Sequence, residues 1–114
     1  LDEKAVAAFN GKVFVHQDAQ KTNAYQQNDT MVLSPYALMN SKPQLEIFAD
    51  DVRCSHGATI GQLDRKSLFY LMARGLDETT ATHMLKAAFL AQVLDAIPVA
   101  ALGDYIRTRM SINL

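Results

Sequence analysis

The sequence predicts an α+β fold in which strands come first and helices follow. Up to about residue 62, apolar residues recur with a period of about two, which is typical of strands with one buried face. After that point they recur at helical spacing, and the change follows the segment 42–61. We therefore expect a β-rich part over residues 1–62 and a helical part, with about three helices, over residues 63–114.

The composition is that of a folded domain without a strongly charged surface. The chain has 114 residues, of which 49% are hydrophobic, and its formal net charge is -1. This hydrophobic fraction is enough for a core. The near-zero charge lacks the basic field that nucleic acid or an anionic membrane would require. We therefore expect neither nucleic acid nor a membrane among the partners.

Cys54 is the only cysteine, so no internal disulfide can form, as is typical of a reducing compartment such as the cytoplasm. The most apolar stretch, 87–102, is interrupted by polar residues and by Pro98, whereas a membrane span needs about 20 mostly apolar residues. No basic leader precedes an apolar run near the N-terminus. Because the sequence begins with Leu1, we interpret it as a fragment of a longer protein.

The strands are predicted from runs of β-branched and aromatic residues, at 12–16, 30–34 and 44–49. The polar segment 17–28 suits a loop, although residues 22–25 also allow a short strand. Residues 1–10 could form a helical turn or a strand. Turn-forming residues predict breaks at Asn10-Gly11, Asn28-Asp29 and Ser41-Lys42-Pro43.

The inward-facing positions change parity at Asp50-Asp51. Before this pair the apolar residues fall on odd positions, and after it the inward set falls on even positions: Val52, Cys54, His56, Ala58 and Ile60. Because strand side chains alternate strictly, this slip predicts a corner or a bulge. Short strands joined by polar corners fit the rungs of a β-solenoid, and they also fit the edge of an ordinary sandwich. The pattern leaves both folds open.

Capping residues mark the first two helices. Asp64 is a good N-cap, Leu63 before it can pack on Leu68, and Gly75 suits a left-handed C-terminal cap. Asp77 is the expected N-cap of the second helix. The apolar stripe expected on that helix consists of Ala81, Met84, Leu85, Ala88, Phe89, Gln92, Val93 and Ala96.

A third helix is predicted from about Val99, because Pro98 ends or kinks the helix before it. Gly103 inside this helix lowers its stability by about 1 kcal/mol relative to Ala. Arg107 and Arg109 lie near its end, where the helix dipole favours cations. The expected apolar face consists of Val99, Leu102, Ile106 and Met110.

The strongest candidate for a functional site is the pair Cys54 and His56, which are two residues apart in a predicted strand and therefore share one face. A thiolate and an imidazole so placed could share a soft metal such as iron or zinc. Two ligands do not complete a site, and the sequence has no Cys-x-x-Cys pair. Two alternatives stay open: a buried thiol beside a hydrogen-bonded histidine, and a cysteine–histidine nucleophile.

Four segments carry a resemblance to a known family: 10–15, 19–28, 42–64 and 68–76. The most specific is 42–64, which contains Cys-Ser-His-Gly-Ala-Thr and ends in Gly-Gln-Leu-Asp. It resembles the C-terminal signature of the SufB/SufD family, the scaffold subunits of the SUF iron–sulfur cluster assembly system. Cys54 and Gly57 favour the SufD branch, because SufB has Glu at both positions.

The resemblance implies a fold and a set of partners. Residues 1–62 would be the last rungs of a right-handed parallel β-helix, and residues 63–114 a C-terminal helical domain. The family's members are non-enzymatic scaffolds. SufD pairs with SufB through the β-helix, can also form a homodimer, and docks the SufC ATPase through the helical domain. The alternatives that we keep are the SufB paralogue with the same role and a Cys/His metal-dependent enzyme domain.

The resemblance also implies the roles of individual residues. His56 would be a ligand of iron or of a nascent cluster at the interface with SufB, and Cys54 a supporting or redox-sensitive neighbour. We expect no tightly bound cofactor, only transient iron or an iron–sulfur cluster shared with the partner subunit. The expected ATPase dock consists of Leu68, Phe69, Tyr70, Arg74, Gly75 and Leu76.

Overall fold

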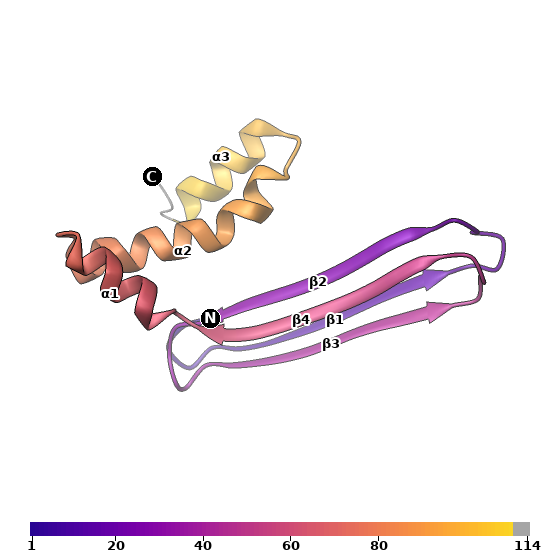
Figure 1. The fold of residues 1–114 in the computed structure, drawn as a ribbon, viewed down its shortest axis with the longest axis horizontal. Helices are drawn as coiled ribbons and strands as arrows, with labels where there is room; N and C mark the ends of the chain where they lie inside the picture. The colour runs from indigo at the N-terminus through magenta and orange to yellow at the C-terminus, as the bar shows by residue number, and fades with distance from the viewer. Residues whose placement is uncertain (111–114) are drawn as a thin grey trace. The chain divides into compact units, whose positions relative to one another are not determined.

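The computed structural model describes residues 1–110, and in this range four strands precede three helices (Figure 1). The chain divides into two compact units. The first, Leu1–Gln62, holds the strands, and the second begins at Leu63 and holds the helices. The predicted α+β class is therefore confirmed. No helix in the described range is long and apolar enough to cross a bilayer.

The strands form two small parallel sheets. They are β1 (Val6–Val15), β2 (Asn23–Val32), β3 (Leu38–Ile47) and β4 (Arg53–Gln62). β1 pairs with β3, from Val6 opposite Leu38 to Val15 opposite Ile47, and β2 pairs with β4 in the same way. β1 and β3 run in one direction and β2 and β4 in the other (Figure 1). The chain therefore visits the two sheets alternately.

The two sheets face each other across a shared interior. Every second side chain of β1, β2 and β3 is partly buried, as in a strand with one covered face. Ser41 on β3 donates to the Asn28 side-chain oxygen on β2 over 3.1 Å, which links the sheets. The corners between strands also stack, because the Lys21 N–H donates to the Asp51 carbonyl over 2.7 Å.

The parity change at Asp50-Asp51 is confirmed. β3 ends at Ile47 and β4 begins at Arg53, with the two exposed aspartates in the corner between them. The partly buried positions are odd in β3, whereas in β4 the even positions pair with the inward positions of β2. Of the predicted inward set, Val52 and Cys54 are partly buried, but His56, Ala58 and Ile60 are exposed. The five-residue corner absorbs the one-residue slip, as the alternation of strand side chains requires.

The three predicted breaks were wrong. Asn10-Gly11, Asn28-Asp29 and Ser41-Lys42-Pro43 all lie inside strands, and so does the second half of the segment 17–28, which was expected to be a loop. Gly11 pairs with Pro43 in the middle of the β1–β3 ladder. Pairing with a neighbouring strand overrides local turn preference here, and Pro43 is tolerated because β3 is an edge strand of its two-stranded sheet.

The predicted helix starts are confirmed. The helices are α1 (Arg65–Ala73), α2 (Glu78–Asp95) and α3 (Ala100–Arg109). The Asp64 carboxylate accepts from the N–H of Lys66 over 3.0 Å, and the Asp77 carboxylate accepts from the N–H of Thr80 over 2.9 Å. Gly75 follows α1 with a φ of +96°, which is the left-handed conformation expected of its cap.

The predicted apolar faces of α2 and α3 were partly wrong. Ala87 and Leu94 are buried and pack with Leu90, Ile97 and Ile106. Ala81 and Ile106 face inward as expected, but Val93, which was placed in the stripe, is 69% exposed, and Val99, Leu102 and Met110 are also exposed. The face is decided by where α3 crosses α2, and this crossing brings buried Gly103 close to the Leu94 carbonyl.

Candidate functional site

Cys54 and His56 lie on β4, at positions that pair with the inward-facing positions of β2. In the β2–β4 ladder Cys54 pairs with Ala24, and His56 pairs with Gln26. Cys54 is partly buried and is a free thiol, whereas His56 is exposed. One donor is thus sheltered by the sheet while the other is open to an incoming ligand.

The pair supplies two donors and no more. Within residues 1–110, no group of three or more His, Cys, Asp or Glu side chains is close enough together to hold a metal ion. His16 directly follows β1 of the other sheet, with its ring 4.6 Å from that of Phe14, and Asp51 forms an ion pair with Lys21. A metal bound at Cys54 and His56 would therefore need further ligands from outside this part of the chain.

The outer face of the same sheet carries a chain of polar side chains that the sequence analysis missed. Tyr25 donates to Gln27, and Gln27 donates to Asp29 over 2.5 Å. Thr59 on β4 also donates to Asp29 over 2.5 Å. These bonds, the Thr59 hydroxyl first and the Gln27 amide second, lower the pKa of Asp29. The available signal was the period-two spacing of these polar residues, in a segment expected to be partly loop.

Gly57 leaves room for this polar chain. It pairs with Gln27, and a Cβ added at Gly57 would overlap the Gln27 Oε1 atom and lie 3.3 Å from the Tyr25 hydroxyl. The glycine next to His56 is therefore required by the neighbouring strand, and not by a turn.

On the inner face, Gln26 is the residue beside His56. Its Oε1 atom is buried and has no hydrogen-bond partner in the described structure. Its carboxamide lies over Gly11 of β1, at a place that a Cβ on Gly11 would occupy. Sequence reasoning did not select Gln26, because only the strand pairing places it next to His56.

The residues expected to dock an ATPase lie on and just after α1. Phe69 is 74% exposed and Tyr70 58% exposed, while Leu68 and Leu76 are partly buried. The Arg74 guanidinium lies 5.2 Å from the centre of the Tyr70 ring, within range of a cation–π contact. Beside them is a mostly apolar hollow of about 460 Å³, lined by Lys66, Ser67, Tyr70, Leu71 and Leu85.

Comparison with known proteins places these features in a family. Residues 1–89 match the family described as "SUF system FeS cluster assembly, SufBD core domain". The chain belongs to this family. The match extends through the four strands, α1 and much of α2.

The matches to individual SufBD relatives reach beyond residue 89. An iron–sulfur cluster assembly SufBD family protein of Synechocystis is 51% identical over 111 residues, 97% of this chain and 24% of the relative. SufD of Escherichia coli is 39% identical over 114 residues, 100% of this chain and 27% of the relative. SufD of Bacillus subtilis is 34% identical over 99 residues, 87% of this chain and 23% of the relative. The chain therefore spans about a quarter of the length of these SufBD relatives.

Proposed function

We propose that this chain is part of a non-enzymatic scaffold subunit of the SUF iron–sulfur cluster assembly system, of the SufD branch, working in the cytoplasm. The observation that carries the proposal is the SufBD core-domain match together with relatives that are named SufD. The Cys54–His56 pair on β4 supports it, because two donors on one face suit a shared site better than a self-contained one.

The four strands would be two consecutive coils of a right-handed parallel β-helix. Three features support this. β1 and β2 each pair in parallel with the second strand after them, the corners are hydrogen-bonded to each other, and alternate side chains face a common interior. In such a fold every coil covers the one before it, and the last coil leaves its outer edge free for a partner. The partner would be SufB, or a second copy of the same subunit.

In this proposal iron, or a nascent iron–sulfur cluster, is cargo that the subunit holds briefly. His56 would bind it through a neutral ring nitrogen, and Cys54 through its thiolate or as a redox-sensitive neighbour. The remaining ligands would come from SufB, which accounts for a half-site in this chain. No tightly bound cofactor is part of the proposal.

The helical unit would dock the SufC ATPase through Phe69 and Tyr70, together with Leu68, Arg74, Gly75 and Leu76. Two exposed aromatic rings beside an apolar hollow are typical of residues that anchor protein interfaces. The adjacent Arg74 offers a charged contact at the rim of the same patch.

The role of His56 is tested in cells that depend on this protein for cluster supply. We expect His56→Ala to abolish the supply while the subunit still accumulates, and Cys54→Ser to have a smaller effect. His16→Ala is the matched control, because His16 is an exposed histidine that follows β1 and lies outside β4. Normal cluster enzyme activity in the His56→Ala cells would contradict the ligand role.

The ATPase dock is tested by co-purification of the intact protein with SufC. We expect the double change Phe69→Ala and Tyr70→Ala to remove SufC from the complex. Tyr105→Ala on α3 is the control, because Tyr105 is 65% exposed and lies outside the proposed patch. Unchanged recovery of SufC with the double variant would place the dock elsewhere.

A further inference from the structure

The carboxamide of Gln26 is held in place from the opposite sheet. A Cβ added at Gly11 would overlap Nε2 of Gln26 and would lie 2.8 Å from its Cδ and 2.7 Å from Cζ of Phe9. The absence of a side chain at Gly11 is therefore what lets Gln26 lie across the interior, next to the Phe9 ring. The side chain is packed in this position, and its Oε1 atom is removed from solvent.

This buried oxygen lacks a donor, which is rare in folded proteins. Gly11 and Phe9, which lie against the carboxamide, offer no side-chain donor, because Gly11 has no side chain and Phe9 has no polar side-chain atom. His56 is the residue paired with Gln26 on β4, and both side chains follow the same parity. Neighbouring strands lie about 4.8 Å apart, so the two side chains start from adjacent positions on the same face of the sheet.

The imidazole of His56 is available for this bond. It is exposed, and in the described part of the chain it makes no hydrogen bond, ion pair or ring contact. A neutral imidazole carries one N–H donor and one bare nitrogen, and a fixed acceptor decides which nitrogen carries the proton. In metal sites such an outer acceptor also orients the ring and makes the bare nitrogen a better ligand.

We propose that Gln26 is the positioning residue of His56: its Oε1 accepts the N–H of one ring nitrogen and leaves the other nitrogen free to bind iron. The inference rests on the proposed role of His56 as an iron ligand. It adds the residue that sets the tautomer and ring orientation before iron arrives. Gly11 takes part indirectly, by leaving the space in which the carboxamide lies.

The tautomer of His56 tests the proposal without any metal. In long-range ¹H–¹⁵N spectra of the intact protein, we expect a single dominant tautomer in the unsubstituted protein. Gln26→Met keeps the length of the side chain but removes the acceptor, and it should give a mixture of tautomers. Gln26→Glu keeps an acceptor and should restore one tautomer. Gln27→Met is the matched control on the outer face and should leave the ring unchanged.

Cobalt(II) serves as the probe of the ligand role. His56-dependent binding is the cobalt(II) binding that is lost in His56→Ala. Its affinity should fall about 10-fold in Gln26→Met, as when an outer acceptor is lost in other metal sites, and should recover in Gln26→Glu. A mixture of tautomers in the unsubstituted protein overturns the proposal even if no variant folds, and so does a Gln26→Met protein with an unchanged tautomer. Iron delivery that survives His56→Ala would overturn the proposed function alone, because the tautomer result would stand.

Discussion

At the residue scale, three glycines in the strands differ in what their missing side chains do. Gly11 leaves room for the Gln26 carboxamide, and Gly57 leaves room for the Gln27 side chain. Gly61 has open space where a Cβ would be. None of the three has the positive φ that favours glycine in turns. The identity of the neighbour across the ladder or the interior therefore explains Gly11 and Gly57.

Gly57→Ala should destabilise the strand unit, and Gly61→Ala should not. The new Cβ at Gly57 overlaps Oε1 of Gln27, so Gln27 must move and release Tyr25 and Asp29. We expect a loss on the order of 1 kcal/mol for Gly57→Ala, because the flexible Gln27 can yield. Gly61→Ala should be neutral or stabilise by about 0.5 kcal/mol through the unfolded chain. Denaturant unfolding of both variants measures the difference, and equal stabilities would contradict the packing argument.

At the element scale, the two aspartate caps decide where α1 and α2 begin. The Ser67 hydroxyl and the Lys66 N–H stabilise the Asp64 carboxylate and lower its pKa. The Thr80 hydroxyl and N–H do the same for Asp77. A lowered pKa means that the folded protein prefers the ionised cap, so both caps favour folding most when they are ionised.

The helical unit should lose stability in acid. The contribution of each cap is complete above the pKa of an unfolded aspartate, about 4, and is lost as the pH falls through the lower pKa of the folded state. Asp64→Asn retains a capping side chain but cannot titrate. We expect its melting temperature to depend less on pH below about pH 4 than that of the unsubstituted protein. Melting is followed by the circular dichroism of the helices at each pH. Identical profiles of melting temperature against pH for the two proteins would show that the Asp64 cap is not coupled to folding.

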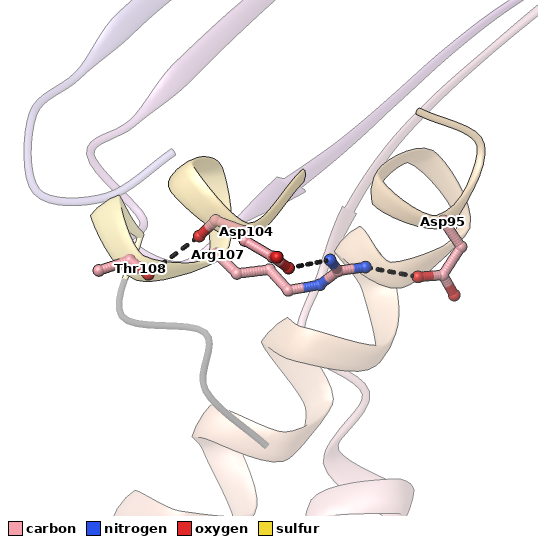
Figure 2. Close-up of polar contacts among 4 residues, drawn as sticks. All are labelled: Asp95, Asp104, Arg107 and Thr108. Atoms are coloured by element: carbon pink, nitrogen blue, oxygen red, sulfur yellow. Dashed lines mark hydrogen bonds and ion pairs between the residues drawn. The ribbon is translucent and has the colours of Figure 1, made fainter. Parts of the chain in front are cut away.

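A glycine and an arginine take part in the contact between α2 and α3, beside the apolar packing of Leu94 and Ile106. Gly103 is buried, and a Cβ added there would lie 3.8 Å from the Leu94 carbonyl and 3.2 Å from Nη1 of Arg107. Arg107 bridges Asp95 of α2, at 2.8 Å, and Asp104 of α3, at 3.3 Å (Figure 2). Because these ion pairs are exposed, each contributes at most about 1 kcal/mol. Close packing at Gly103 is therefore expected to matter more.

A graded series at Gly103 tests this contact. Gly103→Ala places its Cβ at an ordinary distance from the backbone of α2, and it gains helix propensity, so it should be neutral or stabilise by up to about 1 kcal/mol. Gly103→Leu cannot fit without separating the helices, and it should destabilise by about 1–3 kcal/mol. Thermal unfolding of the intact protein measures both changes. Leu102→Ala on the exposed side of α3 is the control. A tolerated leucine at position 103 would mean that α3 does not pack closely there.

At the scale of the whole molecule, each unit has a small core. The buried apolar residues are Val15, Ala49, Ala81, Ala87 and Leu94, and no large side chain in the described range is fully buried. Many large apolar side chains, such as Ile60 and Phe48, are exposed instead. Each described sheet has two strands, so every strand has one unpaired edge. Such edges pair readily with other strands.

The isolated 114-residue chain should therefore self-associate through its strand edges. We expect its mass, measured by light scattering after gel filtration, to rise with concentration. Ile60→Lys places a charge on the exposed end of β4 and should shift the chain toward the monomer. Tyr105→Lys on α3 introduces the same charge on the helical unit and should not. A chain that stays monomeric at all concentrations would show that its edges are protected.

The sequence by itself determined the features that depend on neighbours a few positions away. The order of strands and helices, the caps Asp64 and Asp77, the left-handed Gly75 and the parity change at Asp50-Asp51 were all predicted and are present. Each depends on alternation, on helical spacing or on a side chain that bonds to the next turn. The Cys54–His56 pair on one face was predicted for the same reason, because the two residues lie in one strand.

Only the tertiary structure decided which distant segments meet. The ladders join residues about 30 positions apart, such as Asp29 and Thr59, and these pairings place turn-forming residues inside strands. They also place Gln26 beside His56 and Gln27 opposite Gly57. The buried face of α2 likewise follows from where Gly103 lets α3 approach. Local preferences are worth about 1 kcal/mol or less per residue, so the burial and hydrogen bonds gained between distant segments override them.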